Sequence, residues 1–499
     1  MNQDGDEPAG TGPTAGMPGP AAPHGFARLA RDSVIYAFGS VTGKVIGLLL
    51  LPIVTRLLVP AEFGRLDVLS TLATALTSVA VLGLDVAATR LYPELEPAGR
   101  RRLFGTWTLI ALGAGLPIAA VLGLASPTIS QILFGTTGYA LAVAMVGLYV
   151  IGNLLQVVGL TALRNQRRPF AYAGVSTAAF VVNGVLVALL LHWRPEVSSA
   201  LLGMAVGVTV GGVAALLAAR HLVFGRPGTT EARALFRLGL PLVPALATTW
   251  LGDFVNRIIL LAEAGAAEVG FLSVAVRFGS VGLLVVMGFQ LAWYPHAFGL
   301  GQEPSALQRI ADDAKHIVVG VTLTVVPVGL LAPELLPFVS GAPYAPALPA
   351  LGLSLMVSIG MALYTVATMP SALSQHMRDL GISGTAAALV TIGANFPLAR
   401  LAGSGGTAAA MVLGQLTGVA IAAWLARSRA QVPLAWSAML IVGSAAAVVI
   451  GLATLIPGGA PILVRVGLAF AFLAVLAFEG SLGELIDFAN RARGQLTGR

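Results

Sequence analysis

Long apolar runs separated by short polar turns are the feature that most limits what this chain can fold into. A helix needs roughly 20 mostly apolar residues to cross the hydrocarbon core of a bilayer, and such windows follow one another along nearly the whole sequence. We count fourteen, each bounded by Pro, Gly or Arg clusters, at 33–58, 66–92, 104–126, 138–162, 170–192, 198–221, 236–261, 268–298, 312–337, 346–370, 380–400, 404–426, 433–456 and 461–488. The sequence therefore predicts an all-α polytopic membrane protein.

Composition excludes several other classes of protein. Hydrophobic residues make up 57% of the chain and charged residues only 10%, whereas soluble proteins average about 25% charged residues. The chain contains no cysteine, which excludes disulfides, thiolate nucleophiles and cysteine-ligated metals. We find no phosphate-binding glycine loop, no HExxH pair and no nucleophile elbow, so we expect no catalytic residue, no cofactor and no metal centre.

Basic residues predict the orientation of the chain. With the N-terminus placed in the cytoplasm, 21 of the 29 Lys and Arg residues fall on the cytoplasmic side, 4 on the opposite side and 4 inside windows. Cytoplasmic loops of membrane proteins carry such an excess, so the net charge of +7 needs no nucleic acid partner. Both termini are expected in the cytoplasm, and residues 1–27, rich in Gly, Pro and Ala, are expected to be a disordered tail.

An internal repeat divides the windows into two sets of six. Ala61-Glu62-Phe63-Gly64 lies between the first two windows, and Ala267-Glu268-Val269-Gly270 lies between the seventh and eighth, an offset of 206. Offsets within a few residues of this value relate Arg168 to Arg378, Arg220 to Arg427, and Asn183 to Asn395. Several weak matches in one register predict a six-helix duplication.

Because six is even, the two halves should enter the membrane from the same side and be related by a pseudo-twofold axis along its normal. Such a pair encloses a central cavity that opens alternately to either side. The expected units are a tail at 1–27, an N-lobe at 28–225, a C-lobe at 226–430, and two further helices with a cytoplasmic C-terminus at 431–499.

Charged residues inside the windows are the candidates for lining this cavity. A charge at bilayer depth costs about 2.5–3.5 kcal/mol and should face protein or water. Asp85 lies about one turn before Arg90, and Asp253 lies four residues before Arg257, so each pair can also simply neutralise itself. Lys44, Arg56 and Arg90 can also snorkel. The candidates are Lys44, Arg56, Asp85, Arg90, Asp253, Arg257 and Arg277.

These candidates contain more bases than acids, which favours an anionic ligand. Arginine forks match phosphate geometry, so a ligand with phosphate or pyrophosphate is expected. A cation exporter would instead concentrate acids in its cavity.

Two segments resemble a known family. They are Lys44-Val-Ile-Gly-Leu-Leu-Leu-Leu-Pro52-Ile-Val-Thr-Arg56 continuing into Pro60-Ala-Glu-Phe-Gly64, and Gly239-Leu-Pro241-Leu-Val-Pro244 with Asp253, Arg257-Ile-Ile-Leu260 and Ala267-Glu-Val-Gly270. From about residue 28 to 430 the chain resembles the polysaccharide transporter branch of the multidrug/oligosaccharidyl-lipid/polysaccharide (MOP) exporter superfamily. That superfamily includes O-antigen flippases and, more distantly, lipid II flippases.

The resemblance implies a two-lobed flippase of the bacterial cytoplasmic membrane. Its substrate would be a polyprenyl-diphosphate-linked oligosaccharide, moved from the inner to the outer leaflet for cell-surface polysaccharide synthesis, with no bond made or broken and hence no enzyme activity. The last two helices would form a groove for the lipid tail. Partners would be the lipid-linked glycan, the bilayer and other membrane proteins of polysaccharide assembly.

Coupling to the membrane potential, H⁺ or Na⁺ is possible for such a transporter. By position, Asp253 and Asn395 are weak candidates for a cation site. Relatives often follow this Asn with an Ile-Pro, however, whereas this chain has Asn395-Phe396-Pro397.

Two other functions stay open at this point. A cation-coupled multidrug exporter of the same superfamily predicts unpaired acids in the cavity. A membrane-embedded glycan polymerase or glycosyltransferase would commonly carry a sizeable extramembrane segment, yet no connection between windows exceeds about 15 residues.

Overall fold

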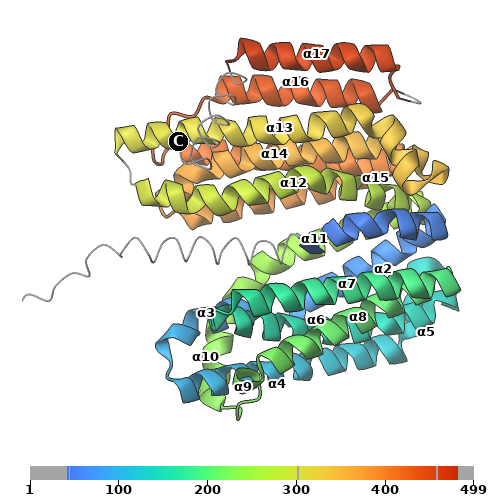
Figure 1. The fold of residues 1–499 in the computed structure, drawn as a ribbon, viewed down its shortest axis with the longest axis vertical. Helices are drawn as coiled ribbons and strands as arrows, with labels where there is room; N and C mark the ends of the chain where they lie inside the picture. The colour runs from blue at the N-terminus through green and yellow to red at the C-terminus, as the bar shows by residue number, and fades with distance from the viewer. Residues whose placement is uncertain (1–41, 44, 301–302, 457–458, 481–499) are drawn as a thin grey trace, which may run out of the picture.

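The computed structural model describes residues 42–480, except 44, 301, 302, 457 and 458. Every long regular element in this part of the chain is a helix, and the helices form two bundles (Figure 1). The prediction of an all-α fold is therefore confirmed for the residues that are described.

The N-terminal half begins with the apolar helix Val45–Leu57. Its other helices are α2 (Pro60–Ala80), α3 (Leu84–Leu91), α4 (Pro97–Leu124), α5 (Ser126–Phe134), α6 (Ala140–Asn165), α7 (Pro169–Trp193), α8 (Val197–Ala218) and α9 (Arg220–Val223), with 3₁₀ turns η1 (Tyr92–Glu94) and η2 (Thr137–Tyr139).

The C-terminal half begins after α9. It comprises α10 (Thr229–Gly239), η3 (Leu240–Leu242), α11 (Val243–Ala264), α12 (Ala266–Leu300), α13 (Pro304–Ser340), η4 (Ala342–Ala347), α14 (Leu348–Leu373), α15 (Met377–Ala426), α16 (Trp436–Thr454) and α17 (Ile462–Phe478).

Among the described residues, nine helices are long and apolar enough to cross a membrane, or ten if the bent pair formed by α2 and α3 counts as one span. The long element α15 is broken by non-helical backbone at Ala402 and Gly403, which is where the sequence predicts one window to end and the next to begin. Each of the fourteen predicted windows overlaps a helix, so the chain is a multi-pass membrane protein.

Two local features differ from the sequence expectation. The window 66–92 is interrupted between α2 and α3 by positive φ angles at Leu82 (55°) and Gly83 (67°), a conformation that glycine adopts easily. The short helix α10 replaces part of a predicted connection. This helix is amphipathic, with one apolar face and many polar and charged residues, so it contains no long apolar run in the sequence.

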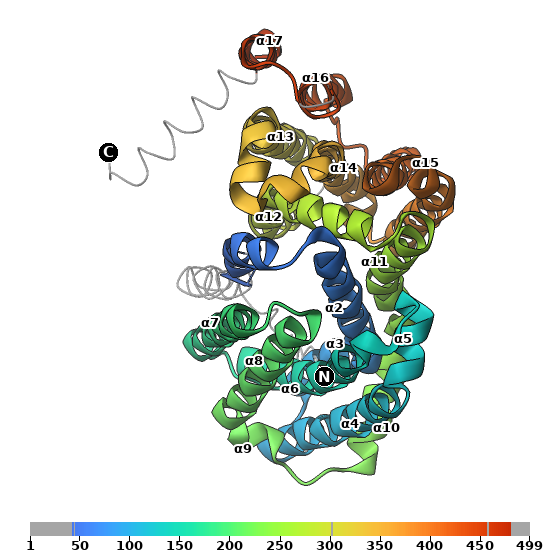
Figure 2. The ribbon, with the colours of Figure 1, turned by 90° about the vertical axis from the view of Figure 1, so that its right-hand side faces the viewer.

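The two halves meet through α2, α11 and α12. In the end-on view the N-terminal bundle of α4, α6, α7 and α8 lies apart from the C-terminal bundle of α12, α13, α14 and α15 (Figure 2). Helix α2 packs against α12 and α11 as well as against α6, and α10 packs on α3 and α4 of the N-terminal half. Helices α16 and α17 lie outermost, beside α13.

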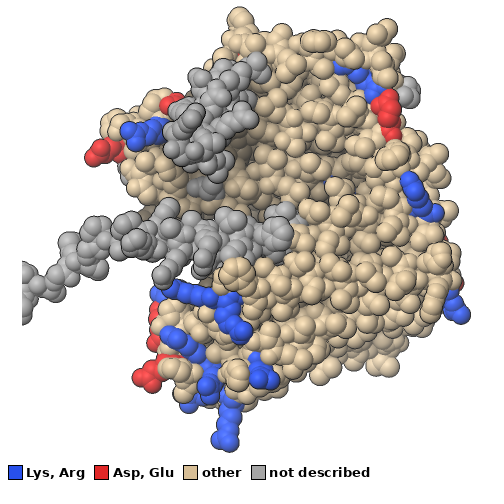
Figure 3. Space-filling model, viewed as in Figure 1, with Lys and Arg blue, Asp and Glu red and all other residues tan. Residues whose placement is uncertain are grey.

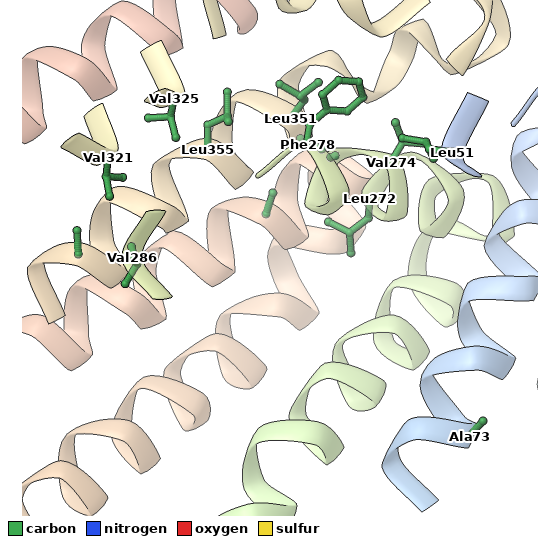
Figure 4. Close-up of a cluster of buried hydrophobic side chains, with 14 of the residues drawn as sticks. Leu51, Ala73, Leu272, Val274, Phe278, Val286, Val321, Val325, Leu351 and Leu355 are labelled. Atoms are coloured by element: carbon green, nitrogen blue, oxygen red, sulfur yellow. The ribbon is translucent and has the colours of Figure 1, made fainter. Parts of the chain in front are cut away.

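Apolar side chains fill the interior of both bundles. In the C-terminal half, Val286 of α12, Val321 and Val325 of α13 and Leu355 of α14 belong to one cluster of buried side chains (Figure 4). In the N-terminal half, α6 and α8 approach so closely that a Cβ on Gly212 would lie 2.5 Å from the carbonyl oxygen of Gly152. Small residues allow such close packing where lipid offers no hydrophobic drive for helix association.

Charge is distributed unevenly over the surface. On the face shown in Figure 3, Lys and Arg gather at the end of the molecule where α3, α9 and α10 lie, and a broad band without charge covers the middle of the helices. An apolar band of this kind is the surface that a bilayer covers.

Candidate functional site

The two halves touch most closely where α2 crosses α12. A Cβ on Gly64 would lie 1.8 Å from the carbonyl oxygen of Ala266, and a Cβ on Gly270 would lie 2.1 Å from the carbonyl oxygen of Pro60. Only glycine allows this backbone contact. Helix α2 runs from the crossing towards α3, which lies at the basic end of the molecule (Figures 1 and 3), so the crossing lies towards the opposite end.

Next to this crossing lies a group of charged and aromatic residues, which we call the central cluster: Phe63, Asp67, Asp253, Arg257 and Arg277. Asp67 and Phe63 belong to α2, Asp253 and Arg257 to α11, and Arg277 to α12. The cluster therefore combines one helix of the N-terminal half with two of the C-terminal half.

An ion pair joins the two halves inside the cluster. Arg257 Nε donates to Asp67 Oδ2 at 2.7 Å, and both side chains are only 10% exposed. Arg257 Nη1 also donates to the carbonyl oxygen of Asp253 at 3.0 Å and lies 3.9 Å from Asp253 Oδ1. The guanidinium of Arg257 is therefore already compensated by two acids, one from each half.

Arg277 has a different environment. Its Cζ atom lies 4.7 Å from the centroid of the Phe63 ring, a geometry that favours a cation over the ring face. The residue is partly exposed, and among the described residues no carboxylate lies within salt-bridge distance of its guanidinium. Asp67 and Arg257 lie within electrostatic range. Arg277 thus keeps N–H donors available to a ligand.

Further contacts join the halves near the same end. Tyr344, which is fully buried, donates from its hydroxyl to the carbonyl oxygen of Leu58 at 2.9 Å, and its ring packs edge-on against Phe63 with centroids 6.0 Å apart. Arg56 is exposed and donates from Nη2 to the carbonyl oxygen of Phe338 at 3.2 Å. Arg56 therefore bridges the halves without belonging to the cluster.

The other candidates from the sequence are placed apart from the cluster or cannot be placed. Arg90 is exposed and forms its ion pair with Glu94, not with Asp85. Asp85 is partly buried, and its Oδ1 atom has no hydrogen-bond partner among the described residues. Lys44 lies outside the described residues.

Asn395 takes part in a buried polar chain rather than in a contact with Asp253. Asn395 Nδ2 donates to the backbone and side-chain oxygens of Asn256 at 3.1 and 3.2 Å, and Thr407 Oγ1 donates to Asn395 Oδ1 at 2.8 Å. Within the described residues no group of three or more His, Cys, Asp or Glu side chains could hold a metal ion. The hydrogen bonds of Asn395 therefore connect α11 to both parts of α15.

Sequence reasoning missed Asp67, Phe63 and Tyr344 as members or neighbours of the site. Asp67 is the second residue of the window 66–92, and a charge at the end of a window is not costly enough to mark a site. A useful signal was the repeated Glu-x-Gly turn, since Phe63 lies within its first copy and Asp67 lies three residues after it.

Comparisons with known proteins agree with this architecture. Residues 29–301, more than half of the chain, match the model of the family described as polysaccharide biosynthesis protein. No curated protein sequence gives a significant match.

Solved structures show the same fold at low sequence identity. The lipid II flippase MurJ in an inward closed conformation is 12% identical with a TM-score of 0.69, and the match covers 91% of this chain and 100% of that one. A MOP superfamily transporter from Pyrococcus furiosus is 16% identical with a TM-score of 0.58, over 80% of this chain and 94% of that one. An outward-facing multidrug resistance MATE family transporter is 14% identical with a TM-score of 0.55, over the same shares.

At such identities the structural matches establish the fold, and the family model establishes the family. The bent and broken apolar helices, the two bundles that meet at α2 and α12, and the matched residues 29–301 lead to one assignment. The chain belongs to the polysaccharide biosynthesis protein family and is a multi-pass membrane protein with the fold of the lipid II flippase MurJ and of transporters of the MOP superfamily.

Proposed function

We propose that this protein is a flippase that moves a polyprenyl-diphosphate-linked oligosaccharide from the inner to the outer leaflet of the bacterial cytoplasmic membrane. Membership of the polysaccharide biosynthesis protein family and the fold shared with a lipid II flippase support this proposal. The observation that carries it is Arg277, a partly exposed residue at the junction of the two halves whose guanidinium has no carboxylate partner among the described residues.

Arg277 suits a diphosphate better than it suits a cationic drug. Its planar fork can bind two phosphate oxygens at once, and Phe63 covers one face of the group while leaving its N–H edge free. The sequence suggested a cavity with excess positive charge, but the described cluster holds two acids and two bases, and Arg257 is neutralised by Asp67. We therefore assign phosphate binding to Arg277 first and to Arg257 only when its pair with Asp67 opens.

The mechanism follows as alternating access. With the basic end in the cytoplasm, as the positive-inside rule requires, the contacts at Gly64, Gly270 and Tyr344 close the outer end. The headgroup would enter from the cytoplasm and reach Arg277 while the polyprenyl chain stays in lipid. Parting of α2 from α12 would then open the outer side.

The membrane potential can drive this movement. An anion moving outward across a negative-inside potential gains about 2.3 kcal/mol per charge per 100 mV. Collapsing the potential should therefore slow flipping in vesicles. Unchanged flux would remove the potential as the driving force and leave ion antiport or mass action.

The deciding experiment is depletion of the protein in its native cell, followed by mass spectrometry of polyprenyl-diphosphate glycans and a test of their accessibility from outside. We expect one completed, inward-facing species to accumulate. When it is expressed in the depleted cells, Arg277→Gln should support about 10- to 100-fold less export than wild type, because a charge-assisted hydrogen bond contributes about 1.5–3 kcal/mol. Arg277→Lys should fall between Gln and wild type.

Arg90→Gln is the matched control, because Arg90 is exposed and lies apart from the cluster. Full export with Arg277→Gln in correctly inserted protein would contradict the proposal.

Cation-coupled drug export is the second candidate, since MATE transporters share the fold. The observation in its favour is Asp253, whose side chain is 46% exposed. Cation-coupled drug export predicts that depletion leaves the pool of lipid-linked glycans unchanged and makes the cells more sensitive to cationic drugs. For the proposed flippase we expect the pool to change and the drug sensitivity to stay the same.

A further inference from the structure

A partly open cavity of about 520 Å³, lined by both polar and apolar side chains, lies in the C-terminal half between α11, α14 and α15. Its volume falls within the range of roughly 300–1,000 Å³ that is typical of small-molecule sites. The polar residues that line it are Asp253, Asn256, Thr385, Thr391 and Gln415. Asp253 belongs both to this cavity and to the central cluster, so the cavity begins within one helical turn of Arg257.

The polar groups of the cavity are available to a ligand. Asn256 accepts from Asn395 with its amide oxygen, and no acceptor for its amide nitrogen is found among the described groups. Gln415 makes only a 3.8 Å contact from its amide nitrogen to the sulfur of Met361. Thr385 is exposed and Asp253 is half exposed. One carboxylate and two amides together offer both acceptors and donors.

Glycines keep the cavity open. Gly252, Gly381 and Gly384 line it, and a Cβ on Gly252 or Gly381 would meet no atom within 4 Å. These two glycines are therefore not required by helix packing, unlike Gly64 at the crossing. The missing side chains leave room that a ligand can fill.

The lining selects among ligand classes. No Lys or Arg lines the cavity, which disfavours an acidic group. Apolar side chains, among them Leu380, Ile392 and Met411, line it beside the polar groups, and no aromatic residue does. A bare cation would find a single carboxylate that Arg257 already approaches to 3.9 Å. Neutral sugar rings, whose hydroxyl groups both donate and accept and whose C–H faces are apolar, fit this mixed lining best.

We infer that this cavity is a subsite for neutral sugar residues of the transported glycan, placed beside the diphosphate at Arg277. This inference rests on the proposed function and deepens it, because it separates recognition of the sugar from recognition of the phosphate. The C-terminal half would then select the glycan, and the junction of the halves would hold the charge common to all such lipids.

The test compares two ligands and three variants. The ligands are the lipid-linked glycans that accumulate in cells depleted of this protein and the same lipids after mild acid has removed the glycan. Gly381→Leu fills the cavity, Gln415→Leu removes one amide at similar volume, and Gly393→Leu is the control. Gly393 lies on the same part of α15, where a Cβ would also meet no atom within 4 Å, but it does not line the cavity.

We expect Gly381→Leu to weaken binding of the glycan-bearing lipid by about tenfold, Gln415→Leu by a few-fold and Gly393→Leu not at all, with binding of the stripped lipid unchanged throughout. Equal affinity of the wild type for both lipids, or equal loss of both in Gly381→Leu, would overturn the inference. Arg277→Gln should weaken both lipids. If it weakens neither, the proposed function fails instead, so the two failures are distinguishable.

Discussion

The two copies of the repeated turn, one before α2 and one before α12, have the same backbone role but different side-chain roles. Gly64 and Gly270 occupy equivalent positions, and each lies against a backbone carbonyl of the other copy, Ala266 or Pro60. The contact is reciprocal, as expected where a pseudo-twofold axis passes through a crossing. Duplication thus explains why two halves of one chain fit together at this point.

The residues that follow each glycine have diverged in a complementary way. In the register of the repeat, Asp67 of the first copy corresponds to Ser273 of the second, and Thr71 of the first copy corresponds to Arg277 of the second. The first copy supplies one acid of the cluster, Asp67, and the second supplies the base Arg277.

The two glutamates of the repeat also differ. Glu62 accepts from the hydroxyl of Tyr139 at 2.7 Å and pairs with Arg65 at 2.5 Å. Glu268 accepts from the backbone N–H of Ser404 at 2.7 Å, where the second part of α15 begins. The equivalent start of α8, at Ser198, instead faces Glu62 across a pocket of about 380 Å³. Of the two glutamates, Glu268 therefore caps the N-terminus of a helix and Glu62 does not.

The largest effect should come from breaking the complementary charges. Arg257→Gln leaves Asp67 buried without its partner, which typically costs about 3–5 kcal/mol, and we expect a loss of this size in the free energy of unfolding in detergent. The double variant Asp67→Asn with Arg257→Gln should recover most of it. Ser273→Ala, at the position equivalent to Asp67, should cost about 1 kcal/mol. Equal losses for Arg257→Gln and Ser273→Ala would contradict complementarity.

Gly64→Ala and Gly270→Ala test the shared backbone role. Each added Cβ would meet a carbonyl oxygen that cannot move away easily, so each should cost about 1–3 kcal/mol. Because both changes act at one crossing, the double variant should be non-additive. Gly113→Ala is the control, since a Cβ there meets nothing within 4 Å and alanine favours a helix. Additive losses would show that the two glycines act independently.

Glu268→Ala and Glu62→Ala test the divergence of the glutamates. Loss of a carboxylate that caps a helix N-terminus costs typically about 1 kcal/mol, so we expect Glu268→Ala to lower the thermal stability more than Glu62→Ala. Hydrogen exchange should rise at Ser404 and the residues after it in Glu268→Ala only. Equal exchange in both variants would mean that the cap does not order the start of this helix.

The smallest effect should come from Arg90→Gln. Arg90 and Glu94 are 70% and 54% exposed in their side chains, and exposed pairs contribute about 0–1 kcal/mol. We expect stability within about 0.5 kcal/mol of wild type and unchanged export. A loss comparable to that of Arg257→Gln would place Arg90 in a network that the described contacts do not contain.

The helices could be predicted from the sequence to a large extent, because burial in lipid is a property of each segment. The apolar windows that became α4, α6, α7 and α8 needed no knowledge of their neighbours. The prediction failed for α10, which is amphipathic, and at Leu82 and Gly83, where a turn breaks one window into two helices. Neither an amphipathic helix nor a turn within an apolar segment changes the length of the apolar runs from which the helices were predicted.

The site was predicted in part. Arg257 and Arg277 were found because charge inside an apolar window is costly wherever it lies. Asp253, four residues before Arg257, was also found, and it lies 3.9 Å from Arg257. The partner in the other half was not found, because Asp67 lies 190 residues from Arg257 in the chain. Arg90 pairs with Glu94, four residues later, and not with Asp85, because two acids lie within one or two helical turns of Arg90 and spacing alone does not choose between them.

The sequence by itself determined that this chain is a membrane protein of duplicated apolar helices, because the cost of burying each segment in lipid adds up along the chain without regard to its neighbours. Only the tertiary structure decided which charges neutralise one another and which stay available. Those choices depend on which helix faces meet at the crossing of α2 and α12, where Arg257 pairs with Asp67 and Arg277 lies over the ring of Phe63 with no carboxylate of the described residues in salt-bridge distance.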